Sequence, residues 1–311
     1  MSAVTIIDVA PRDGFQAVRD FIPTERKIET LKLLEKAGFS RIEIGSCVNP
    51  KAVPQLADID ALLAHADGKS WRAAVLTPNA RGVADALAKG ARDIVYVLSV
   101  SEAHNMSNVR RSVAESFAEL EKALAAAGDR EFFFRFNLAT CFDCPFDGKV
   151  SMADVRDAVA RALEMRAQVE FGICDTTGFA DPAHVGELME RLIGEFGGED
   201  VAFAFHGHDT YGLGVANALA AHEAGVRIFD AAAGGLGGCP FAPGATGNTA
   251  SEDLVFTFEH MGIPTGIDLA ALLDAAEFCA TIEPAQAGGR VRHLPRKRVL
   301  SVQGPGRLAA E

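Results

Sequence analysis

Two histidines separated by one residue follow a run of apolar side chains. The stretch Val201–Phe205 is apolar throughout, and His206-Gly207-His208-Asp209 comes directly after it. We interpret the run as a buried strand, in which side chains at positions i and i+2 point to the same face. Both imidazoles would then lie side by side at the strand end, an arrangement suited to holding a metal ion. The alternative is that the two histidines only cap the strand.

The elements that would position these histidines alternate regularly along the chain. Short apolar segments predict strands at Thr5–Val9, Arg41–Ile44, Arg72–Leu76, Ile94–Leu98, Phe132–Leu138, Val169–Cys174, Ala202–His206 and Ile228–Ala232. Longer amphipathic segments between them predict helices at Thr24–Lys36, Pro54–His65, Ala80–Lys89, Val113–Ala127, Met152–Met165, Pro182–Glu195, Gly214–Glu223 and Ser251–His260. Unbroken β–α alternation predicts an α/β fold, a (β/α)8 TIM barrel. A doubly wound open sheet is the alternative, but no G-x-G-x-x-G follows the first strand.

The chain divides into a barrel and a short tail. We expect a catalytic barrel over residues 1–283, with Asp268–Thr281 as one extra C-terminal helix packed outside it. Residues 284–311 are expected to be irregular. This tail is basic through Arg290, Arg292, Arg296, Lys297, Arg298 and Arg307. It is either a solvated tail or a patch for a polyanion such as a phosphorylated cofactor.

Composition narrows the function classes. The 311 residues carry a net charge of −12, which argues against a nucleic-acid partner. No apolar run is long enough to span a bilayer, and the N-terminus lacks the pattern of a signal peptide. Six cysteines in a chain of this length predict reduced thiols and a cytoplasmic protein. Cys141-Phe142-Asp143-Cys144 is a lone C-x-x-C, which only weakly indicates zinc or redox chemistry.

Polar residues follow several predicted strands at the end where TIM barrels carry their active sites. Any one of them could belong to an ordinary turn, but together they predict a single site. One carboxylate, two imidazoles and an Asn carbonyl suit Mg²⁺ or Mn²⁺ better than zinc. The residues are Arg12 and Asp13 after the first strand, Glu43 on the second, Asp175 after the sixth, His206 and His208 at the seventh, and Cys239 and Asn248 after the eighth.

Several motifs over residues 4–282 resemble the 3-hydroxy-3-methylglutaryl-CoA lyase family. That family belongs to a metal-dependent barrel superfamily that also holds isopropylmalate, homocitrate and citramalate synthases. The glycine-rich stretch with Cys239 and Asn248 is the most specific part and favours the lyases. The motifs are Pro11-Arg12-Asp13-Gly14, Ile42-Glu43, Pro50-Lys51, Val53-Pro54-Gln55, Leu76-Thr77-Pro78-Asn79, Ser101-Glu102, the stretch from His206 to Gly212 and that from Gly234 to Asn248.

The resemblance implies a role for each candidate residue. Asp13, His206, His208 and Asn248 would hold the divalent cation, and Arg12 would stabilise negative charge on the thioester oxygen. Asp13 or His206 would be the base, and Cys239, on a loop that would act as a lid, would relay a proton to the enolate. Glu43 and Asp175 would be supporting acids around the metal and Arg12. The implied substrate is a CoA thioester, and the implied assembly is a homo-oligomer, with a dimer expected.

The chain also departs from that family near the implied substrate site. Phe15-Gln16-Ala17-Val18 replaces the usual Leu-Gln-Asn-Glu, Ala52 replaces a Trp, and Asn137 stands where an aromatic residue is common. We therefore expect the same bond cleavage on an altered acyl substituent. A Claisen-condensing synthase or a hydroxy-keto-acid aldolase is the alternative, although only about fifty residues follow the barrel, too few for a regulatory domain. A non-catalytic binding protein is a third reading, which the retained polar residues oppose.

Overall fold

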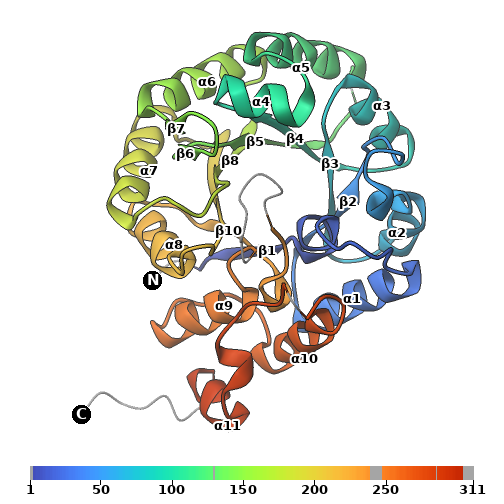
Figure 1. The fold of residues 1–311 in the computed structure, drawn as a ribbon, viewed down its shortest axis with the longest axis vertical. Coiled ribbons are helices and arrows are strands. Elements are labelled where there is room, and N and C mark those ends of the chain that lie inside the picture. The colour runs from blue at the N-terminus through green and yellow to red at the C-terminus, as the bar shows by residue number, and fades with distance from the viewer. Residues whose placement is uncertain (1–2, 129, 239–246, 285, 304–311) are drawn as a thin grey trace.

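Eight parallel strands close into a barrel at the centre of the molecule, as Figure 1 shows. The structure is a computed structural model that describes residues 3–128, 130–238, 247–284 and 286–303. The strands neighbour one another in the order β1-β10-β9-β8-β5-β4-β3-β2. They are β1 (Thr5–Asp8), β2 (Arg41–Ser46), β3 (Arg72–Thr77), β4 (Asp93–Ser99), β5 (Phe133–Ala139), β8 (Val169–Asp175), β9 (Val201–Gly207) and β10 (Ile228–Ala231). The predicted TIM barrel is confirmed, with each strand within two residues of its expected bounds.

A ring of helices surrounds the barrel, and most of them match the prediction (Figure 1). The appended helix is α10, which packs beside α1 and α9. The helices are α1 (Thr24–Ala37), α2 (Ile59–Ala66), α3 (Ala80–Ala88), α4 (Glu102–Val109), α5 (Val113–Ala127), α6 (Met152–Met165), α7 (Pro182–Phe196), α8 (Gly214–Glu223), α9 (Ser251–His260), α10 (Leu269–Ala280) and α11 (Arg296–Val299). None of the helices in the described part of the chain combines the length and the apolar character that crossing a membrane requires.

The helix expected over Pro54–His65 is divided in two. A 3₁₀ turn covers Pro54–Leu56, and α2 begins only at Ile59. The ammonium of Lys27 is buried at the break, where it contacts both carboxylate oxygens of Asp58 at 2.8 and 2.9 Å and the carbonyl oxygen of Gln55. These contacts hold the backbone out of α-helical hydrogen bonding between the two pieces. Two further elements were not predicted: α4, and a small hairpin of β6 (Asp143–Cys144) and β7 (Gly148–Lys149).

The two faces of the barrel strands carry different side chains. Successive residues of a strand point to opposite faces, so Phe134 and Phe136 join the apolar core between barrel and helices. Arg135 and Asn137 therefore face the barrel interior. There, a small apolar cluster of Ala74, Leu76 and Val95 is separate from the outer core. The barrel interior thus holds buried polar and charged side chains next to apolar ones, and the functional side chains lie there.

Within the segment expected to be irregular, residues 291–302 form short helical turns. They are a 3₁₀ turn at Val291–His293, then α11, then a second 3₁₀ turn at Leu300–Val302. The valines of this segment are buried, and the carboxylate of Asp253 accepts hydrogen bonds from the backbone N–H groups of Arg290 and Val291 at 2.8–2.9 Å. Sequence patterns miss such segments because their order depends on contacts with distant helices rather than on internal periodicity.

Candidate active site

Arg12 and Asp13 lie in a tight turn that follows β1. Residues Ala10–Gly14 form one π-helical turn, in which the carbonyl oxygen of Val9 accepts hydrogen bonds from the backbone N–H groups of Asp13 and Gly14 at 2.8 and 3.3 Å. Isolated π-helical turns are frequent at functional sites. Here the turn directs Arg12 and Asp13 into the mouth of the barrel at the carboxyl end of the strands.

The two predicted histidines meet Asp13 at the same end of the barrel. Asp13, His206 and His208 each offer one ligand atom, and these three atoms lie within 4.8 Å of one another. Nε2 of His208 is 3.7 Å from Oδ2 of Asp13, and the centroids of the two imidazole rings are 5.3 Å apart. The sequence prediction that these side chains come together is therefore confirmed, and they form a candidate metal-binding triad.

Asn248 completes this cluster from the segment after β10. Its amide nitrogen donates to Oδ2 of Asp13 at 2.8 Å and to the carbonyl oxygen of Leu236 at 3.0 Å. Its amide oxygen is buried and has no hydrogen-bond partner among the residues that the structure describes, and the same holds for Nδ1 of His208. Buried polar atoms normally have partners, so the unpaired amide oxygen of Asn248 beside the Asp13 carboxylate fits the coordination of a cation. The donor set of carboxylate, imidazole and amide oxygen matches a hard or borderline divalent ion.

Glycines allow the backbone to pack closely around Asn248. Gly237 has φ +130° and Gly247 has φ +96°, conformations that residues with a side chain rarely adopt. A Cβ atom on Gly237 would overlap the side-chain amide of Asn248, and one on Gly247 would overlap the carbonyl oxygen of Gly235. The described glycines of this stretch therefore serve close packing, which positions the Asn248 side chain against Asp13.

Charged partners surround Arg12. Its guanidinium pairs with Asp13 and, at 2.8 Å, with the carboxylate of Glu43 on β2. Burial lowers the pKa of Arg12, but the negative charges of Asp13 and Glu43 outweigh burial and raise it. Burial raises the pKa of Asp13, but the positive charge of Arg12 and the hydrogen bond from Asn248 help to reverse this effect and lower it. Arg12 thus stays a cation, and Glu43 lies where the prediction of an acid beside Arg12 expects it.

Burial also fixes the charge state of His208. It lowers the pKa of His208 to about 4, against the attraction of Asp13. The imidazole is therefore neutral at physiological pH, which is the form that ligates metal ions.

Sequence reasoning missed the partner of His206. Nδ1 of His206 lies 3.0 Å from Oδ2 of Asp230, which leaves Nε2 for a ligand. Asp230 in turn binds Arg135 through two hydrogen bonds of 2.9 and 2.6 Å. Burial opposes ionisation of Asp230, but the charge of Arg135 and the hydrogen bond with His206 lower its pKa to about 2. A carboxylate behind a ligating imidazole orients the ring and raises its basicity.

No pattern in the sequence distinguished Asp230 from the core residues around it. It occupies the middle of an apolar strand, and only the barrel register brings it next to His206.

Asp175 lies at the end of β8, as expected, but its carboxylate is hydrogen-bonded to the backbone of the turn that follows the strand. It accepts hydrogen bonds from backbone N–H groups of residues 178–180, including that of Ala180 at 3.2 Å. Burial raises the pKa of Asp175 to about 7. The contact with Arg12 that sequence reasoning expected is replaced by this turn, and a supporting role in the reaction stays a prediction.

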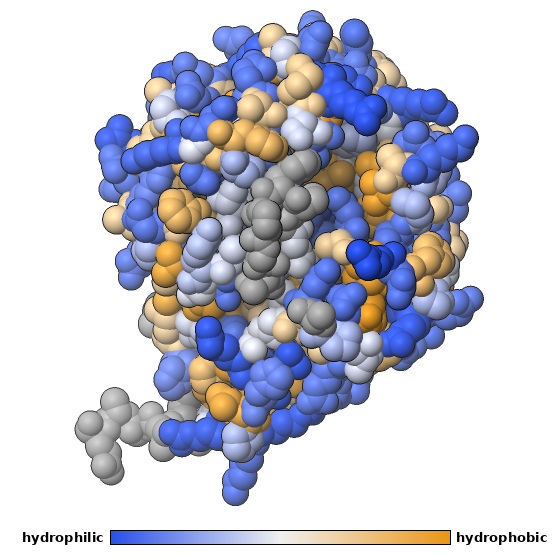
Figure 2. Space-filling view, in the orientation of Figure 1, coloured by the Kyte–Doolittle hydropathy of each residue, from blue (hydrophilic) through white to orange (hydrophobic). Residues whose placement is uncertain are grey.

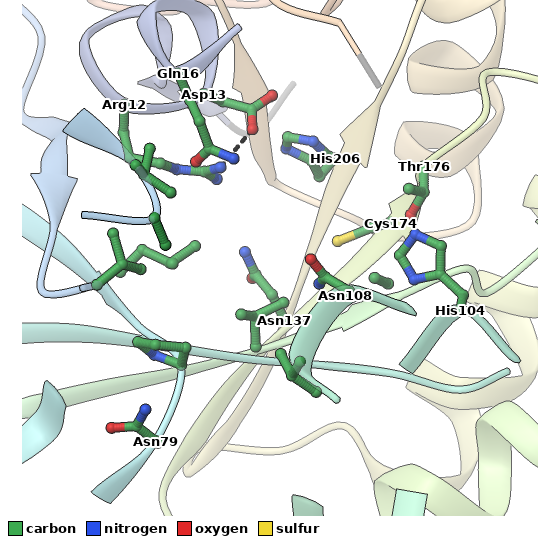
Figure 3. A pocket seen from close by; sticks show the side chains of 18 of the residues that line it. Arg12, Asp13, Gln16, Asn79, His104, Asn108, Asn137, Cys174, Thr176 and His206 are labelled. Carbon is green, nitrogen blue, oxygen red and sulfur yellow. Dashed lines mark hydrogen bonds and ion pairs between the residues drawn. The ribbon is translucent and has the colours of Figure 1, made fainter. Parts of the chain in front are cut away.

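A cavity of about 380 Å³ opens above these residues. Figure 2, in the orientation of Figure 1, shows a hollowed surface over the barrel with apolar side chains in its wall. Arg12, Asp13 and His206 face this space in Figure 3. The unpredicted helix α4 and the segment after it contribute Asn108 and Arg111 to the wall. The pattern that could have revealed α4 is Ser101, which caps its first turn by accepting from the N–H of His104 at 3.2 Å.

Cys239 lies outside the described residues, as does residue range 240–246, where the lid was expected. The five described cysteines are all buried. Burial raises the pKa of Cys47 to about 11 and that of Cys141 to about 12, so these thiols resist ionisation. Cys141 and Cys144 are thus core residues, and the structure gives no support to a zinc or redox site there.

Comparison with known proteins agrees with this geometry. A family model described as HMGL-like matches residues 3–279. The (R)-citramalyl-CoA lyase of Chloroflexus aurantiacus is 43% identical over 289 residues, which cover 89% of this chain and 90% of that protein. The hydroxymethylglutaryl-CoA lyase YngG of Bacillus subtilis is 40% identical over 281 residues, covering 88% and 91%.

A solved structure is also similar to this chain. An HMG-CoA lyase from Acinetobacter baumannii, in complex with coenzyme A and 3-methylmalate, has a TM-score of 0.87 and 38% identity. The match covers 94% of each chain. The similarity therefore extends over the whole barrel and is not confined to the site.

Proposed function

The chain belongs to the HMGL-like family of carbon–carbon lyases, and we propose that it cleaves a short, branched 3-hydroxyacyl-CoA ester with the help of a divalent cation. The proposed substrate is 3-hydroxy-3-methylglutaryl-CoA or a close analogue with another substituent at C3. The products are acetyl-CoA and acetoacetate, or the matching keto acid. The observation that carries the proposal is the meeting of Arg12 with the Asp13, His206 and His208 triad at one cavity.

Two of the similar enzymes indicate which substrates this protein could cleave. The relatives act on hydroxymethylglutaryl-CoA and on citramalyl-CoA, whose acyl groups differ by one methylene between C3 and the terminal carboxylate. A methylene in such a pocket changes discrimination by only about 1–3 kcal/mol. We therefore expect both esters to be cleaved at measurable rates, with the better one identified by kcat/KM.

Asp13, His206, His208 and Asn248 would hold the cation, Mg²⁺ or Mn²⁺. When bound, such an ion lowers the pKa of a hydroxyl group and stabilises negative charge on oxygen. The unpaired amide oxygen of Asn248 and the neutral state of His208 support this assignment.

The residues of the chain account for the movement of protons and charge. A base, Asp13 or His206, takes the proton of the C3 hydroxyl, and the C2–C3 bond breaks as the C3 carbonyl forms. The bonding electrons pass to C2 and the thioester oxygen. Arg12, a buried cation whose Nε has no hydrogen-bond partner among the described residues, donates to that oxygen as its charge develops. Cys239 then delivers or relays a proton to C2, which gives acetyl-CoA.

The decisive experiment is an assay of the purified protein with each ester and with Mg²⁺ or Mn²⁺. Release of acetyl-CoA with acetoacetate or pyruvate, abolished by chelation and restored by the metal, is the expected result. If no ester is cleaved but acetyl-CoA condenses with a 2-keto acid, the protein is a synthase of the same superfamily. If neither reaction occurs, the lyase proposal is wrong.

The role of Cys239 has its own test. Substitution of Cys239 by Ser should strongly impair turnover, and a thiol reagent should inactivate the enzyme unless substrate is present. Since the five described cysteines are buried, peptide mapping should find the label on Cys239. Labelling confined to Cys141, Cys144 or Cys279 would refute the assignment. Light scattering would test the expected dimer.

A further inference from the structure

Asn137 lies at the floor of the cavity, where polar and apolar surroundings meet. Along β5 it pairs in register with Val97 of β4 and Gly172 of β8. Val97, Cys174 and Ala139 line the cavity beside it, and the buried charged pair of Arg135 and Asp230 lies beneath. Only 4% of Asn137 is exposed, so its amide group needs nearby partners.

The orientation of the Asn137 amide is fixed from below. Its oxygen accepts a hydrogen bond of 2.7 Å from Nε of Arg135, whose Nη atoms are bound to Asp230. A Cβ atom on Gly172 would overlap that same amide oxygen, so glycine in β8 makes the room for this contact. Because the oxygen is held by Arg135, the NH₂ group must point the other way. Figure 3 shows the nitrogen directed into the space between Arg12 and His206.

An NH₂ group that points from the floor into the cavity needs a hydrogen-bond acceptor on the ligand. A carboxylate accepts hydrogen bonds only, and a bond to a charged group is worth about 1.5–3 kcal/mol. Within the proposed substrate, the bulky CoA must stay at the mouth and the C3 hydroxyl must lose its proton. The substituent at C3 with its carboxylate is the part that can reach the floor.

We propose that Asn137 determines substrate specificity by donating a hydrogen bond to the carboxylate of the C3 substituent. This inference rests on the proposed lyase function. It adds the residue that recognises the acyl part of the substrate. The Arg135–Asp230 pair then serves two groups at once, because it orients Asn137 on one side and His206 on the other. An aliphatic side chain or a phenylalanine at position 137 would lack the donor.

Two variants separate hydrogen-bond donation from packing. Asn137→Asp keeps an oxygen for Arg135 and the size of the side chain but removes the donor. Asn137→Leu removes both polar atoms at similar volume. Each variant and the wild type are assayed with a carboxylate-bearing ester, such as 3-hydroxy-3-methylglutaryl-CoA, and with an analogue in which a methyl group replaces the carboxylate. Mn²⁺ affinity and the melting temperature are measured in parallel.

Both variants should lower kcat/KM for the carboxylate ester by about 10- to 100-fold, which corresponds to one charge-assisted hydrogen bond. For the uncharged analogue the change should stay within about threefold. Mn²⁺ affinity should be unchanged in Asn137→Asp. An equal loss on both esters, or no loss on either, would overturn the specificity role.

A binding measurement keeps this test independent of the proposed function. Calorimetry with a short hydroxy dicarboxylic acid, in the presence of Mn²⁺, should give weaker binding to both variants than to the wild type. If the wild type cleaves neither ester, the lyase proposal fails, and the calorimetry alone decides the role of Asn137. Equal affinity for wild type and variants would then refute it.

Discussion

Two groups of buried charged residues share the interior of this barrel and differ in how completely they are paired. The first, which we term the ion-pair network, consists of Arg41, Asp93, Arg135, Glu170 and Asp230. The second is the metal cluster of Asp13, His206, His208 and Asn248. In the network, Arg41 contacts Asp93 at 2.6 Å and Glu170 at 2.5 Å, and Arg135 binds Asp230 through two hydrogen bonds. In the metal cluster, Nδ1 of His208 and the amide oxygen of Asn248 have no hydrogen-bond partner within the described part of the chain.

Position along the strands explains the difference. Arg41 and Asp93 are the first residues of β2 and β4, at the end of the barrel that serves stability. The metal cluster lies at the carboxyl ends, beside a cavity. Burial of charge therefore does not by itself identify a site. An acceptor that lies beside the Asp13 carboxylate and has no partner among the described residues, such as the amide oxygen of Asn248, is a better sign, because a bound cation would satisfy it.

The largest effect is expected from breaking the metal cluster. His206→Ala and His208→Ala should each abolish measurable Mn²⁺ binding and lower turnover by about a thousandfold or more, since a metal ion supplies several kcal/mol of charge stabilisation. Calorimetry and the lyase assay measure the two effects, and His293→Ala, in the exposed C-terminal segment, is the control. Unchanged metal affinity in both variants would rule out the cluster as a metal site.

Breaking the ion-pair network should affect stability instead. Arg41→Met leaves Asp93 and Glu170 without their shared partner, and removal of one member of a buried ion pair typically costs about 3–5 kcal/mol of unfolding free energy. Urea denaturation measures this loss. The Mn²⁺ affinity of the folded variant should stay within about threefold of wild type. A stable Arg41→Met variant that loses metal would contradict the separation of the two groups.

Arg12 should behave as a group of the site despite its ion pairs. Arg12→Gln is expected to fold and to bind Mn²⁺ but to lower kcat by about a hundredfold or more, because one donor to a developing oxyanion is lost. Circular dichroism and calorimetry verify folding and metal binding before kinetics are compared. Activity within a few-fold of wild type would assign Arg12 a structural role.

Asp230 connects the network to the metal cluster and should give a smaller effect. Asp230→Asn keeps the shape of the side chain but weakens its hold on Nδ1 of His206, 3.0 Å away. Loss of such a carboxylate typically lowers metal affinity by about 10- to 100-fold. Titration with Mn²⁺ measures the change. An unaltered dissociation constant would mean that the network and the cluster are independent.

Glu252 is a buried acid outside both groups and outside the cavity lining. One of its carboxylate oxygens has no hydrogen-bond partner among the described residues. Burial raises the pKa of Glu252 to about 8, while its other oxygen accepts from the N–H of Gly234 at 3.0 Å. The folded protein thus holds a proton that the unfolded chain releases near pH 4.5. This contribution to stability is complete below that pH and disappears as the pH rises through about 8.

Glu252→Gln mimics the protonated acid and should flatten the decline of unfolding free energy between pH 5 and pH 8. The slope should change by at most about 1.4 kcal/mol per pH unit, the value for one proton. Denaturant titrations at several pH values measure it. Identical slopes in the variant and the wild type would show that Glu252 is ionised in the folded state.

The sequence determined the barrel and most of the site. Alternating apolar and amphipathic segments located all eight barrel strands, because each strand must bury an outer face and each helix one stripe. The rule that chemistry gathers at the carboxyl ends of strands then brought Arg12, Asp13, Glu43, His206 and His208 together. These inferences succeed because they depend on local patterns and on one property of the fold.

Only the tertiary structure decided which buried polar groups act together. Asp230 and Arg135 lie inside strands, where the sequence gives no sign that one holds His206 and the other holds Asn137. Asp175 occupies the expected strand end, yet its carboxylate stabilises a turn. Such partnerships depend on the register between strands that are distant in sequence, and on which hydrogen bonds burial leaves unsatisfied. Both are properties of the closed barrel rather than of any segment of the chain.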